Sequence, residues 1–158
     1  MRKFLKQSPF KGLFILNRRF LTMGEKTLAK TVFGDALALD DIEIVAHHLV
    51  LKDYAISPNG NVYFHPKDWC EDFSLKNLNE QSWLIHELTH VWQIQQGIAV
   101  IRKALIDRRY QYVLTAGKLF SQYGIEQQAQ MVQDYFIKSR QGKNCDAYHQ
   151  CIPFLVKH

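Results

Sequence analysis

The pattern of apolar and polar residues changes its period along the chain. In the first half, residues 42–44 alternate between apolar and polar as a β-strand does, and two short segments, 55–56 and 61–64, also have extended character. Between these two segments lies the tetrapeptide Ser57-Pro58-Asn59-Gly60, in which proline presets φ and Asn-Gly tolerates a positive φ. The pattern therefore predicts a small antiparallel sheet that is partly a hairpin.

A short helix is predicted before this sheet, over residues 24–33. Thr22 is followed three residues later by Glu25, which is the spacing of a capping box, and Gly34 is a natural stop for the helix.

Helical periods dominate the second half of the chain. One helix is expected from a cap at Asn79 to about Gln96, where Gly97 ends it, and two further helical segments are expected over residues 100–120 and 125–138. The first of these helices has a row of apolar positions: Trp83, Leu84, Leu88, Val91 and Trp92.

The order of the predicted elements is a helix, a small sheet and then more helices, which is typical of an α+β fold rather than of alternating βαβ units. A length of 158 residues suits one domain. We therefore divide the chain into a basic N-terminal arm, residues 1–21, and a single domain, residues 22–158.

The formal net charge is +5, and the excess of basic residues gathers near the start and around residues 102–109. Such runs are usually solvated faces, and the chain contains no aromatic-and-basic RNA-binding signature and no helix-turn-helix pattern. No specific nucleic-acid partner is expected, although a basic nucleic-acid-associated module is the third function that the composition allows.

The N-terminal segment superficially resembles a signal peptide. Lys11 and Arg18-Arg19 confine its apolar run to residues 13–16, which is too short for the core of such a signal. No stretch approaches the roughly 18 apolar residues of a membrane span. We expect a protein that is cytoplasmic as synthesised and whose export, if any, uses no cleaved signal peptide.

The chain has three cysteines, an odd and low number that argues against a disulfide framework. Cys145, His149 and Cys151 lie close together in the sequence, but a closed structural zinc site needs a fourth ligand. A disulfide or free thiols are the preferred interpretation.

The segment His86-Glu87-Leu88-Thr89-His90 contains the strongest candidate chemistry. On a helix, residues four apart lie on the same face, so His86 and His90 can bind one metal ion. Glu87 lies beside them and is suited to take a proton from water, which is the physical content of HExxH as a zinc hydrolase motif. We therefore predict Zn²⁺ as the cofactor, with Glu87 as the catalytic base.

A catalytic zinc site uses three protein ligands and one open position. Glu126 is the preferred third ligand, because it begins a predicted helix one helical segment after the motif, and the small Ala129 lets the two helices pack closely. The other candidates are His149, His65 and His158.

The segment HELTHVWQ resembles the small HExxH domains found with contractile injection systems and with Vgr- and Rhs-associated bacterial toxins, the extracellular contractile injection system core domain. The resemblance extends over residues 22–97. It includes Phe33-Gly34-Asp35, residues 55–64, Pro66, Trp69 and Leu84. It implies a zincin-like fold, peptidase activity and association with a secretion system. The family commonly has HVVQQ where this chain has HVWQIQQ, a difference that concerns helix packing and not metal ligation.

Residues 124–129, Gly-Ile-Glu-Gln-Gln-Ala, are similar to the Glu-x-x-Ala ligand segment of gluzincin-type metallopeptidases. This likeness implies that Glu126 is the glutamate ligand.

These observations favour a zinc metallopeptidase that acts on a peptide or protein substrate and is a bacterial secretion-system-associated effector. The segment 61–65 is expected to present a strand edge to the substrate. Tyr123 and His65 are the candidates for contact with the substrate or the oxyanion. The alternative is a non-catalytic zinc-binding accessory protein of a secretion apparatus, and the presence of Glu87 favours the enzyme because a purely structural site does not need it.

Overall fold

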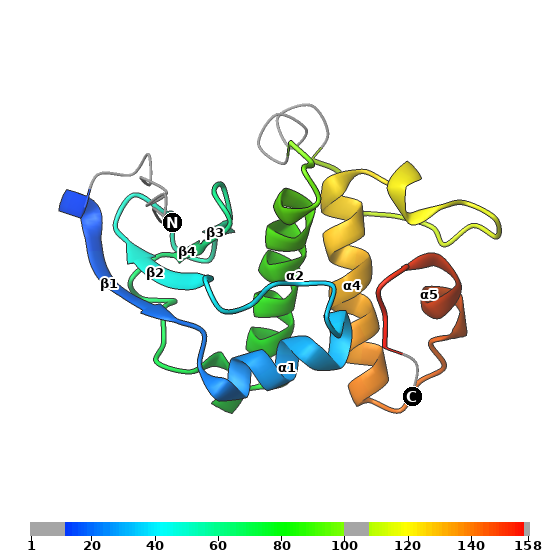
Figure 1. The fold of residues 1–158 in the computed structure, drawn as a ribbon, viewed down its shortest axis with the longest axis horizontal. Coiled ribbons are helices and arrows are strands. Elements are labelled where there is room, and N and C mark those ends of the chain that lie inside the picture. Colours follow the sequence, from blue (N-terminus) through cyan, green and yellow to red (C-terminus); the bar gives the residue numbers. More distant parts are fainter. Residues whose placement is uncertain (1–11, 100–107, 157–158) are drawn as a thin grey trace, which may run out of the picture.

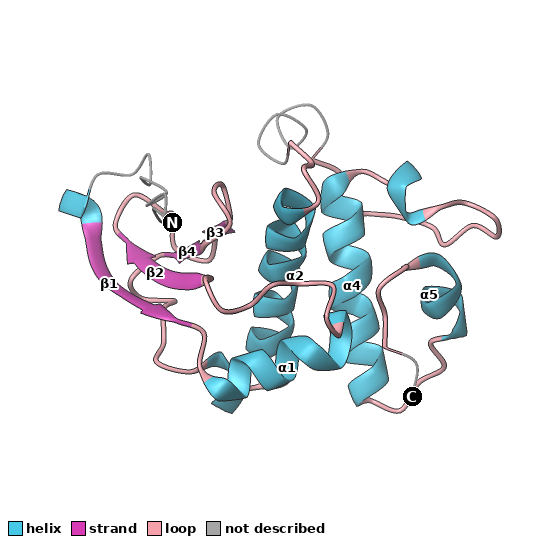
Figure 2. Cartoon of the chain, in the orientation of Figure 1, coloured by secondary structure: helices cyan, strands magenta, loops and turns pink. Residues whose placement is uncertain are grey.

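The helix that contains the HExxH segment, α2 (Leu78–Gln95), stands in the middle of the molecule, between a small sheet and the C-terminal helices (Figure 1). The computed structural model describes residues 12–99 and 108–156. Helix α4 (Ile125–Arg140) lies beside α2, the short α5 (Asp146–Cys151) lies beyond it, and α1 (Met23–Phe33) crosses in front of both (Figures 1 and 2). No helix in the described ranges is long and apolar enough to cross a membrane.

The sheet has four strands in the order β1-β2-β4-β3. Strand β1 (Ile15–Phe20) pairs antiparallel with β2 (Glu43–His47), and β3 (Ala55–Ile56) pairs antiparallel with β4 (Val62–Phe64) across the expected turn. The hairpin is therefore confirmed. In contrast, β2 and β4 are parallel, so the expectation of an antiparallel sheet is wrong and the sheet is mixed.

The burial of β4 sets its place in the sheet. All three residues of β4 are buried, whereas β3 is only partly so. A strand that is buried on both faces belongs inside a sheet, so β4 is an inner strand and β3 is the edge. The expectation that residues 61–65 present a free edge is therefore wrong, and the free edge beside the turn belongs to β3.

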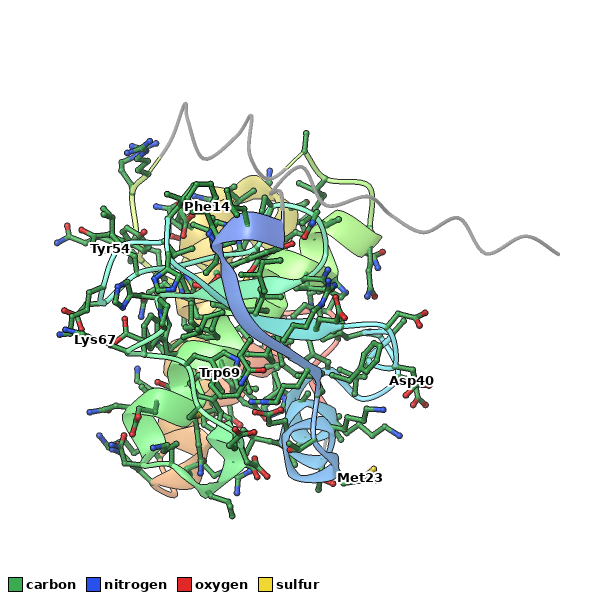
Figure 3. All side chains as sticks on the ribbon, turned by 90° about the vertical axis from the view of Figure 1, so that its left-hand side faces the viewer. Phe14, Met23, Asp40, Tyr54, Lys67 and Trp69 are labelled. Atoms are coloured by element: carbon green, nitrogen blue, oxygen red, sulfur yellow. The ribbon has the colours of Figure 1, made fainter. Side chains whose placement is uncertain are left out.

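Part of the segment expected as an arm takes part in the sheet. Residues 15–20 form β1, the outer strand, which carries the exposed side chains of Leu16 and Phe20. Figure 3, with β1 towards the viewer, shows Trp69 beside this strand, and the Arg19 guanidinium lies 5.5 Å from the centre of the Trp69 ring. The remainder of the arm, residues 1–11, lies outside the described residues, and the division into domains stays a prediction.

Three predicted helices have different outcomes. The capping box of α1 is confirmed, because Thr22 accepts from the backbone of Glu25 and the Glu25 side chain accepts from the backbone of Thr22. Helix α4 is also confirmed. The start of α2 is corrected, because Asn77 and not Asn79 is the cap, and its side chain accepts from the backbone N–H of Glu80.

The helix expected over residues 100–120 is wrong for its described part. Residues 108–115 have no regular secondary structure, and a short 3₁₀ turn (Phe120–Gln122) precedes α4. Tyr112 and Leu114 pack against the core, and these tertiary contacts override the helical propensity of the segment. Residues 100–107 lie outside the described residues.

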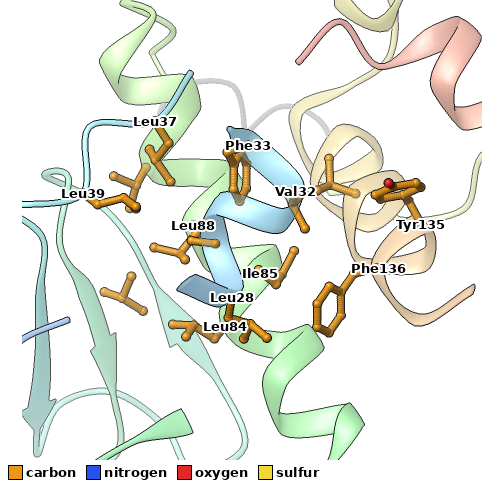
Figure 4. Packing of buried hydrophobic residues seen from close by; sticks show 14 of the residues in the cluster. Leu28, Val32, Phe33, Leu37, Leu39, Leu84, Ile85, Leu88, Tyr135 and Phe136 are labelled. Atoms are coloured by element: carbon orange, nitrogen blue, oxygen red, sulfur yellow. The ribbon is translucent and has the colours of Figure 1, made fainter. Parts of the chain in front are cut away.

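The hydrophobic core lies where α1 crosses α2 and α4. Figure 4 shows Leu28, Val32 and Phe33 of α1 among apolar side chains of the other two helices. Their neighbours there include Leu84, Ile85, Leu88, Tyr135 and Phe136. This packing holds α2 and α4 side by side, which decides where their polar faces meet.

A buried carboxylate ties the sheet to α1. Glu25 is fully buried, and it accepts hydrogen bonds from the guanidinium of Arg19 on β1 and from the backbone N–H groups of Thr22 and Phe73. Arg19 also donates to the carbonyl of Cys70. The pair therefore joins the outer strand, the start of α1 and the loop before α2.

We expect Glu25→Gln to lower the free energy of unfolding by about 3–5 kcal/mol, because breaking a buried ion pair leaves the Arg19 charge without its partner. Urea unfolding followed by circular dichroism measures the change. The control is Asp40→Asn, which removes the carboxylate that pairs with Lys26 at the exposed surface and should change stability little. Equal stability of Glu25→Gln and the wild type would contradict this role of the pair.

Candidate metal centre

Two histidines of α2 and a glutamate of α4 converge on one point. His86 and His90 lie one turn apart on α2, and Glu126 lies in the first turn of α4. The Nε2 atoms of His86 and His90 lie 3.4 Å and 3.2 Å from the same oxygen, Oε2, of Glu126. One ligand atom from each residue falls within 4.8 Å of the others, and no other group of three such residues gathers in the described ranges.

The outer nitrogens of both histidines are held by glutamine side chains. Nδ1 of His86 lies 3.0 Å from Oε1 of Gln133, and Nδ1 of His90 lies 2.8 Å from Oε1 of Gln93. An amide oxygen only accepts, so each Nδ1 is the donor in the neutral ring and each Nε2 keeps its lone pair. Hydrogen bonds of this kind orient histidine ligands in metal sites.

Helix packing sets these glutamines in place. The amide nitrogen of Gln93 donates to the carbonyl of Ile125 and to Oε1 of Gln128, so its oxygen faces His90. Gln128 in turn donates to the carbonyl of Tyr123. Ala129, one turn after Ile125, is fully buried, as expected for two closely packed helices. The start of α4 is thus bonded directly to the histidine-bearing face of α2.

His90 and Glu126 shift each other's pKa. Burial opposes protonation of His90, but the hydrogen bond to Glu126 and the charges of Glu87 and Glu126 outweigh it and raise the pKa of His90 to about 9. Burial also disfavours the Glu126 carboxylate, yet hydrogen bonds from His86 and His90 lower the pKa of Glu126 to about 2. The Glu126 carboxylate is therefore anionic and stabilises a proton on Nε2 of His90, and this proton must leave before that nitrogen can bind a metal.

Glu87 lies beside the cluster, and a residue of the turn between β3 and β4 holds its side chain. It is buried, and its Oε2 accepts a hydrogen bond of 2.9 Å from the hydroxyl of Ser57 in the turn between β3 and β4. Sequence reasoning treated Ser57 only as a turn residue. The separation of the two residues along the chain concealed the contact, and no local signal indicates it.

A tyrosine that sequence reasoning missed faces the cluster. The ring of Tyr110 lies 6.1 Å from that of His86, and its side chain is half exposed. Partial burial, followed by the charges of Glu126 and Glu87, raises the pKa of Tyr110. It escaped notice because it falls in the segment expected to be a helix.

The residues expected to contact substrate have other partners in the structure. The hydroxyl of Tyr123 donates to the carbonyl of Val113 and accepts from the backbone N–H of Thr115, which pins that loop. Nδ1 of His65 accepts from the backbone N–H of Lys67. Their contact with a substrate stays a prediction.

The C-terminal candidates lie apart from the cluster. His149 is on α5, where its ring lies 5.2 Å from that of Tyr135. Cys145 and Cys151 are free thiols, and their sulfurs lie against the carbonyls of Lys143 and Lys118 respectively. These residues do not form a metal-ligating group with His149. His158 lies outside the described residues.

The donor set suits zinc. Once both Nε2 atoms are deprotonated, the two imidazoles and one carboxylate are a known ligand set of catalytic zinc sites, in which the fourth position is open. In such a site, each histidine binds the metal through one ring nitrogen and donates a hydrogen bond from the other. Here the Nε2 atoms face the centre of the cluster, and the Nδ1 atoms are bonded to glutamine amides. The three residues predicted from the sequence as ligands are therefore those that the fold brings together.

Comparisons with known proteins place the chain beside a bacterial secretion protein. It is 38% identical over 135 residues to the type VI secretion system spike protein VgrG2b of Pseudomonas aeruginosa, a match that covers 78% of this chain and 13% of that protein. The chain thus spans about an eighth of the length of this relative. No protein-family model matches the chain.

A solved structure matches most of the fold. The effector domain of Pseudomonas aeruginosa VgrG2b aligns with a TM-score of 0.73 and 35% sequence identity, and the alignment covers 88% of this chain and 84% of that one.

Proposed function

Because the chain belongs to the family of the effector domain of Pseudomonas aeruginosa VgrG2b, we propose that it is a bacterial secretion-system effector that hydrolyses peptide bonds with zinc. The observation that carries the enzymatic part is the pairing of the His86, His90 and Glu126 cluster with a buried carboxylate, Glu87, directly beside it. A structural zinc site needs no such carboxylate, whereas hydrolysis needs a base at this position.

The proposed division of labour follows from the geometry of the cluster. His86, His90 and Glu126 would hold the metal, each histidine oriented through its outer nitrogen by a glutamine. A zinc ion bound there supplies Lewis acidity, polarising a carbonyl group and lowering the pKa of water towards about 7.

Glu87 is assigned the proton transfers. It accepts a proton from the attacking water and passes it to the leaving amine. The Ser57 hydroxyl engages Oε2 of Glu87, so we assign the proton to the other oxygen, Oε1. This contact holds the carboxylate in one orientation without removing its negative charge.

Two further features are assigned to the substrate. Tyr110, which faces His86, is the preferred donor to the developing oxyanion. The edge strand β3 leads directly into the turn that contains Ser57, so an extended peptide paired with β3 would pass close to Glu87.

The test is hydrolysis of a denatured protein mixture, such as reduced and carboxymethylated casein, by the purified chain. New peptides should appear, a zinc chelator should stop their formation, and zinc added after removal of the chelator should restore it. Hydrolysis that persists in the chelator would contradict the proposal. A chain that holds zinc but releases no peptides from casein or from bacterial cell-envelope protein would favour the non-catalytic accessory role.

A further inference from the structure

A cavity of about 840 Å³ lies between α4, α5 and the segment that precedes the 3₁₀ turn. Its walls come from residues 110–114, from α4 and from Tyr148 of α5. Tyr110 lines this cavity and also faces His86, so the cavity begins next to the candidate metal centre.

The wall on α4 is a stripe that starts at the cluster. Gln130, Asp134 and Lys138 line the cavity and follow Glu126 at intervals of four residues, which places them along one side of the helix. At 1.5 Å per residue, the distance from Glu126 to Lys138 is about 18 Å along the helix axis. That is the length of roughly five residues of extended polypeptide.

The opposite wall is an extended segment without a strand partner. Along residues 111–114, exposed and partly buried side chains alternate, with Gln111 and Val113 outward and Tyr112 and Leu114 against the core, as in a β-strand. Yet no backbone-to-backbone hydrogen bond joins residues 110–114 to any other part of the chain that the structure describes. In an extended segment, alternate residues present their N–H and C=O groups at the same edge. The backbone groups of residues 110, 112 and 114 have no hydrogen-bond partner among the described residues, so this edge is available to an added strand.

Side chains hold this segment in place instead. The amide of Gln127 donates to the carbonyl of Gln111 over 2.6 Å, and the hydroxyl of Tyr123 donates to the carbonyl of Val113 over 2.9 Å. A segment fixed in this way loses little conformational entropy when a strand pairs with it.

The polar side chains of the cavity bond to one another. Asp134 accepts from Gln130 over 2.8 Å and from the hydroxyl of Tyr112 over 2.6 Å. Tyr112 also bonds to Tyr148, which accepts from Lys138. One carboxylate and one ammonium are thus linked through tyrosines, so the lining has no net charge to attract a phosphate or another ion. Recognition would come from peptide groups, and it would tolerate many sequences.

We propose that this groove, between residues 110–114 and α4, binds the extended backbone of a polypeptide by strand addition, next to the metal centre. This proposal rests on the proposed function, because the groove would hold several residues of the substrate on one side of the bond to be cleaved. Peptide groups of the substrate pair with the free backbone groups of residues 110, 112 and 114, while α4 forms the floor.

The test measures binding without hydrolysis, in the Glu87→Gln chain. The probe is fluorescein-labelled, reduced and carboxymethylated casein, and binding is followed by fluorescence anisotropy. Gln130→Trp should weaken binding by at least about tenfold, because the indole fills the groove and prevents one or two backbone hydrogen bonds. The control is Lys143→Trp, which adds the same side chain at an exposed position after α4 and should leave binding unchanged.

A second variant guards against misfolding of the first. Leu114→Pro removes one backbone N–H from the free edge of the extended segment without touching α4. Circular dichroism establishes that each variant is folded, and Leu114→Pro should also weaken binding. Equal affinity of both groove variants and the control, or no binding of casein by the Glu87→Gln chain, would overturn the proposal.

The two proposals fail separately. If the chain never cleaves casein but the groove variants bind it more weakly, the groove proposal is supported and the peptidase proposal is contradicted. If the chain cleaves casein in a chelator-sensitive way but the groove variants bind casein as the control does, the peptidase proposal is supported and the groove proposal is contradicted.

Discussion

Replacing Glu87 with glutamine is expected to slow peptide hydrolysis by about 10²–10⁴-fold, the usual contribution of a positioned general base. Glutamine has nearly the same shape and can still accept the hydrogen bond from Ser57, but its amide does not take up a proton at neutral pH. Because Glu87 is outside the three-residue ligand cluster, zinc content and folding should persist. The measurement is the rate of casein hydrolysis beside elemental zinc analysis.

Glu71→Gln is the matched control for this experiment. It makes the same chemical change at an exposed position and should leave the rate at the wild-type value. Equal, chelator-sensitive rates for Glu87→Gln and the wild type would remove Glu87 from the mechanism. Loss of zinc in Glu87→Gln would instead show that Glu87 takes part in ligation.

Replacing Glu126 with alanine is expected to weaken zinc binding by more than 100-fold. Loss of a residue that hydrogen-bonds to a metal ligand typically lowers metal affinity by about 10–100-fold. Removing a ligand itself should lower the affinity further. Gln133→Leu, which removes the acceptor of the His86 Nδ1 hydrogen, should fall within that lower range. The measurement is competition for zinc with a chromogenic chelator.

The wild type should hold about one zinc per chain, and a His86→Ala/His90→Ala double variant should hold none. His149→Ala is the control, because His149 lies outside the cluster. Unchanged zinc affinity in Glu126→Ala, together with loss of zinc in His149→Ala, would show that the third ligand comes from α5 and that the cluster seen in the structure is not the metal site.

Features decided within a few residues were predictable from the sequence. The capping box at Thr22 and Glu25, the turn at residues 57–60 and the one-turn spacing of His86 and His90 all depend on neighbours along the chain. Such contacts have the same geometry in any fold that contains the helix or the turn. The small error at the start of α2 is of the same local kind. Asn79 was expected as the cap and Asn77 is the cap, and both are suitable residues in one short segment.

The position of Glu126 was partly accessible in the same way. Its place at the start of a helix could be predicted from the sequence, and so could the small Ala129 behind it. The preference for Glu126 over His149 also used a resemblance to gluzincin-type metallopeptidases. Only the packing of α1 across α2 and α4, with the bonds from Gln93 to the start of α4, determines that its carboxylate meets both histidines.

Other features were decided by the tertiary structure alone. The parallel pairing of β2 with β4, the contact between Ser57 and Glu87, and the place of Tyr110 beside His86 join residues far apart in sequence. The sequence by itself thus determined the local pieces and the chemistry that they can perform. Which pieces meet depends on which apolar surfaces are buried together, and that balance is a property of the whole chain and of no single segment.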